Sequence, residues 1–137
     1  MSYASAARNR YVTNTISTTT PAQLLVMLYD RLVLDLTRAA DAATAGDVAT
    51  VHDNLVHAQE IVLQLRSSLD ETAWSGGPGL AQLYRFVEDE LVQANIEKKA
   101  GRITAIKDLV IPLAEAWRQA TAAPAPAAPV QSIRASA

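Results

Sequence analysis

The stretch that decides the fold is residues 48–69, VATVHDNLVHAQEIVLQLRSSL. Apolar residues recur in it at steps of three and four, which places them along one face of an α-helix. The preceding pair, Gly46 and Asp47, supplies a turn residue and an N-cap for that helix. We therefore predict a helix here with one apolar stripe facing a core. The stripe consists of Val48, Val51, Leu55, Ala58, Val62, Leu65 and Leu69.

Helical periodicity continues on both sides of this stretch, between breaks at Gly46, residues 76–79 and Gly101. No segment alternates with a period of two over the length of a strand, so we predict an all-α protein. Long helices with short connections pack as antiparallel neighbours. The expected architecture is an up-and-down four-helix bundle over residues 21–120. The other stripes are Leu25, Leu28, Tyr29, Leu32, Leu36, Ala39 and Ala43; Leu80, Leu83, Tyr84, Val87, Leu91 and Ala94; and Ile103, Ile106, Val110, Leu113, Trp117 and Ala120.

Several residues predict where the helices begin, end or bend. Thr20 suits an N-cap and Pro21 suits the first helical position after it. Gly46 and Gly101 suit the left-handed position that follows a helix. Pro112 lies inside the fourth periodic stretch, where proline lacks an N–H donor. We expect a kink there, or a helix that is interrupted and restarts.

The two ends of the chain fall outside the predicted bundle. Residues 1–20 are rich in Thr, Ser and Asn and carry a few apolar anchors, so they are expected to form an arm or a short helix packed on the bundle. Residues 121–137 contain three prolines among many alanines. Such a tail buries too little apolar surface to offset the entropy of ordering it, and we expect it to be disordered.

Composition bounds the function. The 137 residues fit one domain, and a net charge of −2 argues against nucleic acid as a partner. The absence of cysteine excludes disulfides, Cys-ligated metal centres and cysteine nucleophiles. Residues 24–29 form the longest run of large apolar residues, which is too short to cross a bilayer, and no export signal is visible. These features predict a cytoplasmic protein with no direct membrane insertion.

The motifs of enzymes on helical scaffolds are missing from the sequence. It has no Glu-x-x-His pair, no His-Glu-x-x-His, no Gly-x-Ser-x-Gly and no phosphate-binding loop. His52 and His57 leave a histidine phosphotransfer domain as an alternative, but neither is followed by a residue that would stabilise a phosphoryl group. We therefore expect no catalytic residue, no metal and no cofactor.

The helices carry more apolar residues than one core needs. A bundle helix uses about three apolar positions in seven, and extra stripes run along the sides of these helices. A wide, overpacked core and a homodimer face are two explanations; grooves for a partner helix, a peptide or the N-terminal arm are the third. The surplus residues are Leu24, Val26, Met27, Val33, Leu34, Val56, Ile61, Leu63, Phe86, Val92, Ile96, Leu109 and Ile111.

An ordered set of short motifs resembles the FliS family of flagellar export chaperones. It begins with YVTNTI at residues 11–16, TPAQLL at 20–25 and MLYD at 27–30. It continues with Gly46-Asp47, an Ala58-x-x-Ile61-x-x-x-Leu65 stretch and Leu69-Asp70, and ends with Gly76-Gly77, Leu83-Tyr84, Ala94-Asn95 and Ala116-Trp117. The resemblance covers about residues 3–119.

The resemblance implies an antiparallel helical bundle that binds the disordered C-terminal segment of flagellin, prevents its premature polymerisation and docks at a component of the flagellar type III export gate. A helical adaptor or regulator for another protein is the alternative. The free chain would be a monomer or a weak homodimer. In this reading Tyr11 and Ile16 anchor the arm, and Asn95 makes a hydrogen bond inside the bundle. The partner-binding candidates are Tyr11, Ile16, Leu24, Leu28, Tyr29, Leu32, Tyr84, Leu91 and Asn95.

Overall fold

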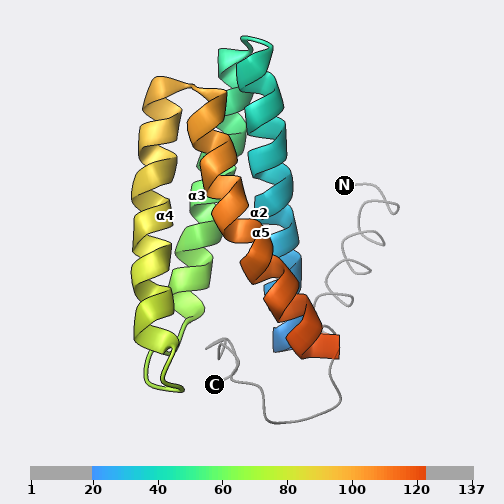
Figure 1. Cartoon of the computed structure of the whole chain (residues 1–137), viewed down its shortest axis with the longest axis vertical. Helices are drawn as coiled ribbons and strands as arrows, with labels where there is room; N and C mark the ends of the chain where they lie inside the picture. Colours follow the sequence, from blue (N-terminus) through green and yellow to red (C-terminus); the bar gives the residue numbers. More distant parts are fainter. Residues whose placement is uncertain (1–19, 123–137) are drawn as a thin grey trace, which may run out of the picture.

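The computed structural model describes residues 20–122. Within that range the chain forms four helices and no β-sheet: α2 (Pro21–Thr44), α3 (Val48–Ser68), α4 (Gly77–Glu97) and α5 (Ala100–Ala122). The helices run alternately up and down, and each packs against its neighbours along the chain while α5 closes the ring against α2 (Figure 1). The predicted all-α four-helix bundle is confirmed. Residues 1–19 and 123–137, which make up most of the predicted arm and most of the predicted tail, lie outside the described range.

The four helices do not pack equally around the ring, because α5 is inclined to the others. It starts beside α4 and leans across the bundle, so that its last turns lie beside the beginning of α2 (Figure 1). The pairing of α5 with α2 is accordingly extensive, whereas α4 and α5 form the loosest pairing of the four. This lean leaves side chains on both flanks of α5 without a full set of helical neighbours.

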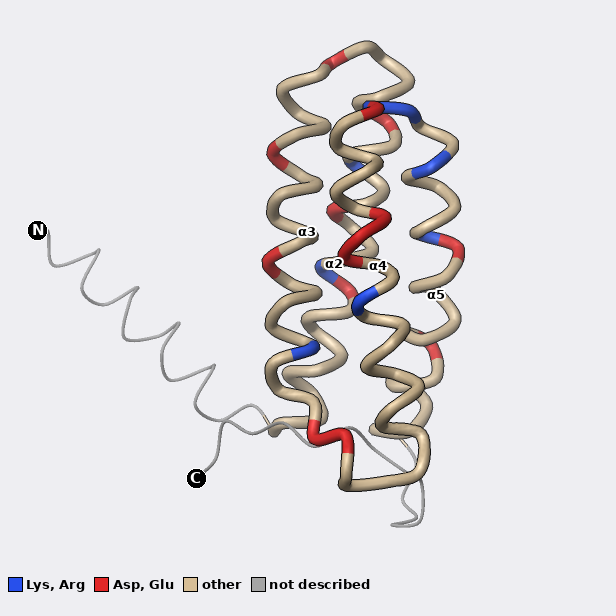
Figure 2. Tube along the Cα trace, turned by 90° about the vertical axis from the view of Figure 1, so that its left-hand side faces the viewer, with Lys and Arg blue, Asp and Glu red and all other residues tan. Residues whose placement is uncertain are grey.

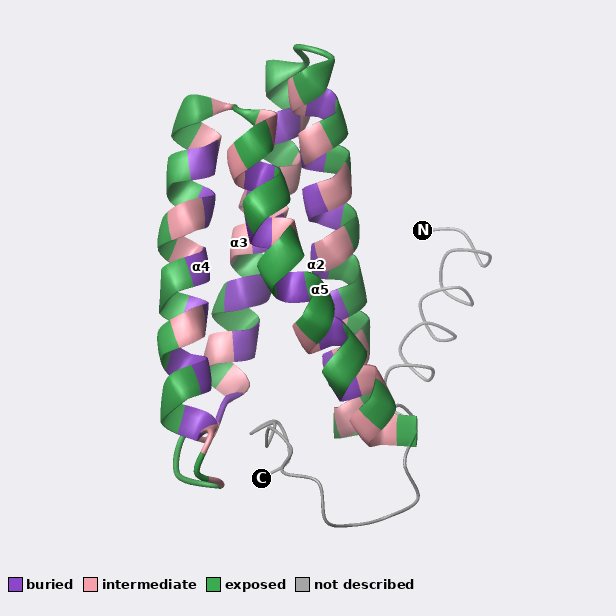
Figure 3. Cartoon of the chain, in the orientation of Figure 1, coloured by how far each residue is buried: buried purple, intermediate pink, exposed green. Residues whose placement is uncertain are grey.

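The predicted stripes form the core, as the inward-facing buried residues in Figure 3 show. Leu36, Leu55, Val62 and Leu91 are fully enclosed, with 0% of their surface exposed. The prediction was wrong for Val48, which is 58% exposed. It is the first residue of α3 and lies beyond the point where the other helices cover that stripe.

The ends of α2 follow the sequence signals. Thr20 and Gln23 form a capping box, in which each side chain accepts a hydrogen bond of 3.1 Å from the other's backbone N–H. At the other end Gly46 has a φ of 75°, and the N–H groups of Gly46 and Asp47 donate to the carbonyls of Ala43 and Ala42. This is a Schellman motif, so the predicted left-handed role of Gly46 is confirmed.

The predicted role of Gly101 was wrong. Lys98 takes the left-handed position after α4, with a φ of 58°, and Gly101 lies in the first turn of α5. The ammonium of Lys98 donates to both the backbone carbonyl and the side-chain oxygen of Asn95. The ammonium is a donor for the Asn95 carbonyl at the helix end, which a glycine would lack, and these bonds offset the strain of a side chain at positive φ.

Helix α5 is not interrupted at Pro112, contrary to one of the two expected outcomes. The proline removes the donor that would bond the carbonyl of Asp108. Both residues are exposed, so water can hydrate that carbonyl and the helix continues.

The loop between α3 and α4 depends on a glycine that packs against backbone. A Cβ on Gly77 would lie 2.3 Å from the carbonyl oxygen of Glu71, whereas a Cβ on Gly79 would meet no atom within 4 Å. The Gly77→Ala variant should therefore lose about 1–3 kcal/mol of unfolding free energy through overpacking. Gly79→Ala is the matched control and should be neutral or stabilising, because alanine favours helix. Urea denaturation of both variants measures the difference; equal midpoints would contradict this close contact.

Candidate functional site

The surplus apolar side chains are mostly on the surface. Leu24, Val26, Val33 and Val56 are half-buried, and Ile61 is buried and belongs to the core. All the others in the surplus set are exposed, so the explanation by an overpacked core fails for them. With Val48, the exposed large apolar residues are Met27, Leu34, Leu63, Phe86, Val92, Ile96, Leu109 and Ile111.

One hollow lies between α2 and α5 and has a volume of about 450 Å³. We call it the α2–α5 groove. Val33, Leu34, Ile111 and Ala114 supply its apolar lining, together with Thr37. Leu34 and Ile111 come from different helices and are 38% and 37% exposed, so each has surface left to bury against a ligand.

Charged side chains complete the lining of the α2–α5 groove. The guanidinium of Arg118 donates to Glu115 at 2.9 Å and also to Asp30, which joins α5 to α2. The hydrogen bonds to Glu115 and Asp30 raise the pKa of Arg118 above its ordinary value. An apolar floor bordered by ion pairs suits a segment that is apolar on one side and polar on the other.

A second hollow, the α4–α5 groove, lies on the other flank of α5 and has a volume of about 280 Å³. Phe86 of α4 and Leu109 of α5 supply much of its apolar surface. The guanidinium of Arg102 binds Glu90 at 3.2 Å and Glu97 at 2.8 Å. Helix α5 is therefore flanked on both sides by apolar grooves with charged side chains in or beside them.

A third hollow, the tryptophan pocket, has a volume of about 190 Å³. It lies between the last turns of α5, the α3–α4 loop and the first turn of α4. The rings of Trp74 and Trp117 meet edge to face, with centroids 6.5 Å apart. Among the described residues the buried indole N–H of Trp74 has no hydrogen-bond acceptor. The remaining lining residues are Leu80, Leu113, Ala116 and Ala120.

The structure distributes the nine partner-binding candidates over three environments. Tyr11 and Ile16 lie outside the described residues. Leu24, Leu28 and Asn95 are half-buried. The other four are buried in the core, where they support the grooves rather than line them; these are Tyr29, Leu32, Tyr84 and Leu91. These four residues, which the family resemblance suggested, lie on the predicted apolar stripes and face the core.

Asn95 does not bond inside the bundle as expected. Its amide donates to Nδ1 of His52 at 3.1 Å, and this contact between α4 and α3 lies on the surface. The stripe position next to it is taken by Ala94, which is fully buried.

Tyr29 and Tyr84 are joined by a hydrogen bond of 2.6 Å between their hydroxyls. They belong to α2 and α4, which lie diagonally across the bundle and are not packed against each other. Burial raises the pKa of Tyr29, although the hydrogen bond to Tyr84 opposes that shift. The ring of Trp117 packs beside Tyr29, with ring centroids 6.5 Å apart. Tyr84 and Trp117 are both buried and belong to the core.

The raised pKa of Tyr29 predicts a loss of stability in alkali. In the unfolded chain this phenol ionises near pH 10, while the folded chain keeps its proton, so the stability it contributes is lost as the pH rises above about 10. The slope contributed by this residue is at most about 1.4 kcal/mol per pH unit. Urea midpoints of the wild type and Tyr29→Phe between pH 8 and 11 should converge as the pH rises. If the urea midpoints of the two proteins instead differ by the same amount at every pH, the raised pKa of Tyr29 is contradicted.

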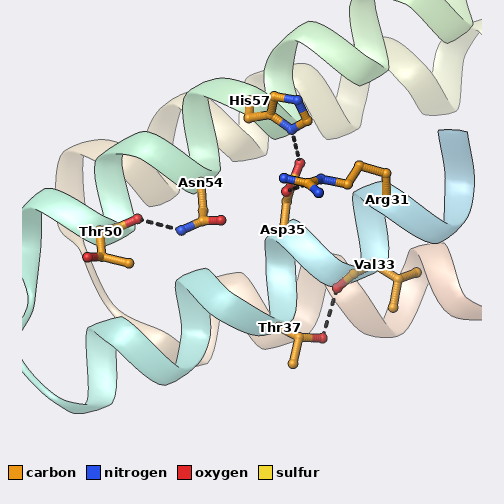
Figure 4. Close-up of polar contacts among 7 residues, drawn as sticks. All are labelled: Arg31, Val33, Asp35, Thr37, Thr50, Asn54 and His57. Carbon is orange, nitrogen blue, oxygen red and sulfur yellow. Dashed lines mark hydrogen bonds and ion pairs between the residues drawn. The ribbon is translucent and has the colours of Figure 1, made fainter. Parts of the chain in front are cut away.

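A buried carboxylate links α2 and α3 (Figure 4). Asp35 is 0% exposed, and its two oxygens accept from Nε of Arg31, at 3.1 Å, and from Nδ1 of His57. Sequence reasoning missed this cluster, because Asp35 stands among leucines and its histidine partner lies on the next helix. Both histidines thus have structural partners, His57 on Asp35 and His52 on Asn95.

Charge and metal chemistry offer no rival site in the described part of the chain. Figure 2 shows Lys and Arg dispersed among Asp and Glu along the helices. Between residues 20 and 122 no cluster of three or more potential metal ligands occurs. None of the described helices combines the length and apolar character needed to cross a bilayer.

Comparison with known proteins identifies the family. The family model described as "Flagellar protein FliS" matches residues 3–124. Two curated relatives are both named flagellar secretion chaperone FliS. The one from Bacillus subtilis (strain 168) is 30% identical over 110 residues, which cover 80% of this chain and 82% of the relative. The one from Salmonella typhimurium (strain LT2) is 32% identical over 112 residues, which cover 79% and 82%. This chain belongs to the FliS family of flagellar secretion chaperones and is a chaperone rather than an enzyme.

Proposed function

We propose that this chaperone binds the C-terminal segment of flagellin in the cytoplasm, prevents its premature polymerisation and delivers it to the flagellar type III export apparatus. The observation that supports the proposal is the pair of apolar grooves on the two flanks of α5. A chaperone for a secreted filament protein needs an apolar surface that a disordered segment can occupy. The grooves provide that surface on rigid helices.

The proposed mechanism is coupled folding and binding. The flagellin segment lays apolar side chains into the α2–α5 groove over Leu34 and Ile111, and then into the α4–α5 groove over Phe86 and Leu109. A helix contacts such grooves with side chains spaced three and four residues apart, which lie on one of its faces. The segment loses conformational entropy as it orders, so part of the burial energy is offset and the complex remains reversible. Reversibility is what release at the export apparatus requires.

The rims of the grooves add orientation. Arg118 stands between two carboxylates at one groove, and Arg102 stands between two at the other. Exposed ion pairs contribute little to affinity. A bound segment is nevertheless disfavoured if it places a positive charge against the arginine or a negative charge against the carboxylates. They therefore help to fix the direction in which the segment lies.

The proposal is tested by calorimetry with the C-terminal segment of flagellin from the same organism, with a scrambled peptide of the same composition as control. We expect a 1:1 complex with a Kd below about 1 μM, which corresponds to about −8 kcal/mol. A negative heat-capacity change should accompany it, since apolar surface is buried. Absence of heat and of co-elution with the native segment would refute the proposal and assign the grooves to a different protein partner.

A further inference from the structure

The tryptophan pocket is separate from the two grooves of the proposed function. It is lined by Leu113, Ala116 and Trp117 of α5, whereas the α2–α5 groove uses Ala114 and Arg118 on a different face of that helix. Its volume of about 190 Å³ is smaller than that of either groove and suits small side chains rather than a whole helix. Two of its six lining residues, Trp74 and Trp117, are aromatic.

We propose that the proline-rich segment of this same chain, residues 123–130, docks into the tryptophan pocket. The first reason is where the described chain ends. Ala120 lines the pocket and α5 ends two residues later, at Ala122. The segment therefore begins at the mouth of the pocket and needs no long linker to reach it.

The length of the segment also fits. From Ala122 back to Leu113, at the far end of the pocket, α5 rises about 14 Å at 1.5 Å per residue. An extended proline-rich chain advances about 3.1 Å per residue, so about five residues span that distance. Residues 123–130 are sufficient to turn and run back along α5.

The composition of the segment is complementary to the pocket. It reads APAPAAPV, and its prolines favour the polyproline II conformation that aromatic-lined grooves bind. Alanine and proline lose no rotamer entropy when they are buried. Proline lacks an N–H, and a polyproline II segment forms no internal hydrogen bonds, so docking this segment against apolar walls leaves few backbone donors without a partner.

This inference refines the expectation of a disordered tail. The tail by itself buries too little apolar surface to become ordered. The pocket supplies a preformed apolar surface on the same chain, so docking does not cost the translational entropy of bringing two molecules together. Docking would cover Trp74 and the exposed Ala116 without touching the grooves flanking α5. The inference therefore stands or falls independently of flagellin binding.

The test uses a nitroxide spin label and the two tryptophans. The chain has no cysteine, so Ala127→Cys gives a single labelling site in the otherwise full-length protein. The chain also has two tryptophans, and both line the pocket, so their two indole N–H signals in NMR spectra report on it. We expect the label to reduce both signals at least twofold relative to its reduced, diamagnetic form.

Two variants distinguish docking from mere tethering. Pro124→Ser, Pro126→Ser and Pro129→Ser together keep the tail length and should lessen the reduction of both indole signals to the level that tethering alone produces. Ala116→Arg fills the mouth of the pocket from an exposed position and should do the same, whereas Ala105→Arg, an equally exposed alanine of α5 in the α4–α5 groove, should leave the reduction intact. Equal reduction in all variants, or no reduction in any, overturns the proposal. A reduction seen only between labelled and unlabelled copies would assign the pocket to a second chain and overturn it as well.

Discussion

The double variant Arg31→Met/His57→Leu is expected to lose about 3–5 kcal/mol of unfolding free energy at pH 7. Asp35 is completely enclosed, and these two side chains bind its two oxygens. Methionine and leucine keep the carboxylate covered but give it no donor. An ionised group left in an apolar site without a partner is among the most destabilising changes available in a small domain.

One further variant separates this effect from general damage to the α2–α3 contact. Adding Asp35→Leu to the double variant should recover most of the loss, because an apolar residue suits the apolar surroundings that the two substitutions create. Urea denaturation at pH 7 of the wild type, the double variant and the triple variant measures the recovery. A triple variant no more stable than the double variant would show that Asp35 is not the source of the loss.

The second large effect concerns the proposed flagellin site. Leu34→Asp/Ile111→Asp should weaken binding of the flagellin C-terminal segment at least 100-fold, about 2.7 kcal/mol or more. Each position lines the α2–α5 groove and has exposed surface that the segment would cover. A carboxylate placed there must lose its hydration when the segment binds, with no partner in an apolar ligand face.

The matched control is Val48→Asp/Leu63→Asp. These residues are exposed and apolar too, but they lie on α3 and line none of the three hollows described above. Leu34 and Ile111 are 38% and 37% exposed, against 58% and 50% for Val48 and Leu63, so thermal unfolding of both double variants must first show that each is folded at the temperature of the binding experiment. Calorimetry should show a loss for the groove pair alone. Equal affinities in the two variants would exclude the α2–α5 groove as the site.

The sequence was sufficient to predict the helices and most of the core. The step pattern of Val51, Leu55 and Val62 has one geometric reading, and the structure confirms it. The surplus of apolar residues indicated more of them than one core needs, and the structure leaves several, such as Phe86, exposed. Both inferences depend on local spacing along one helix, which a sequence displays directly.

The details of the site depend on how helices meet, which spacing along one helix does not reveal. Tyr29 and Tyr84 were partner-binding candidates, but their hydroxyls bond to each other in the core. The grooves lie on the two flanks of α5, which leans across the bundle. Asp35 can be buried because His57, on the neighbouring helix α3, binds its carboxylate. Lys98 replaced the expected glycine because its own side chain bonds back to Asn95. Each of these features depends on a contact between particular side chains, which the spacing of apolar residues along the sequence does not show.

The hydroxyl pair of Tyr29 and Tyr84 has a consequence for the uniqueness of the fold. A core of leucine, valine and alanine tolerates sliding of one helix against another by a turn, because apolar contacts are not directional. A slip of α4 by one turn would move its hydroxyl about 5.4 Å and separate the two oxygens inside an apolar core. The bond crosses the diagonal of the bundle, so it fixes the register of helices that do not pack against each other. One phenol on each helix thus favours a single alignment over the neighbouring ones.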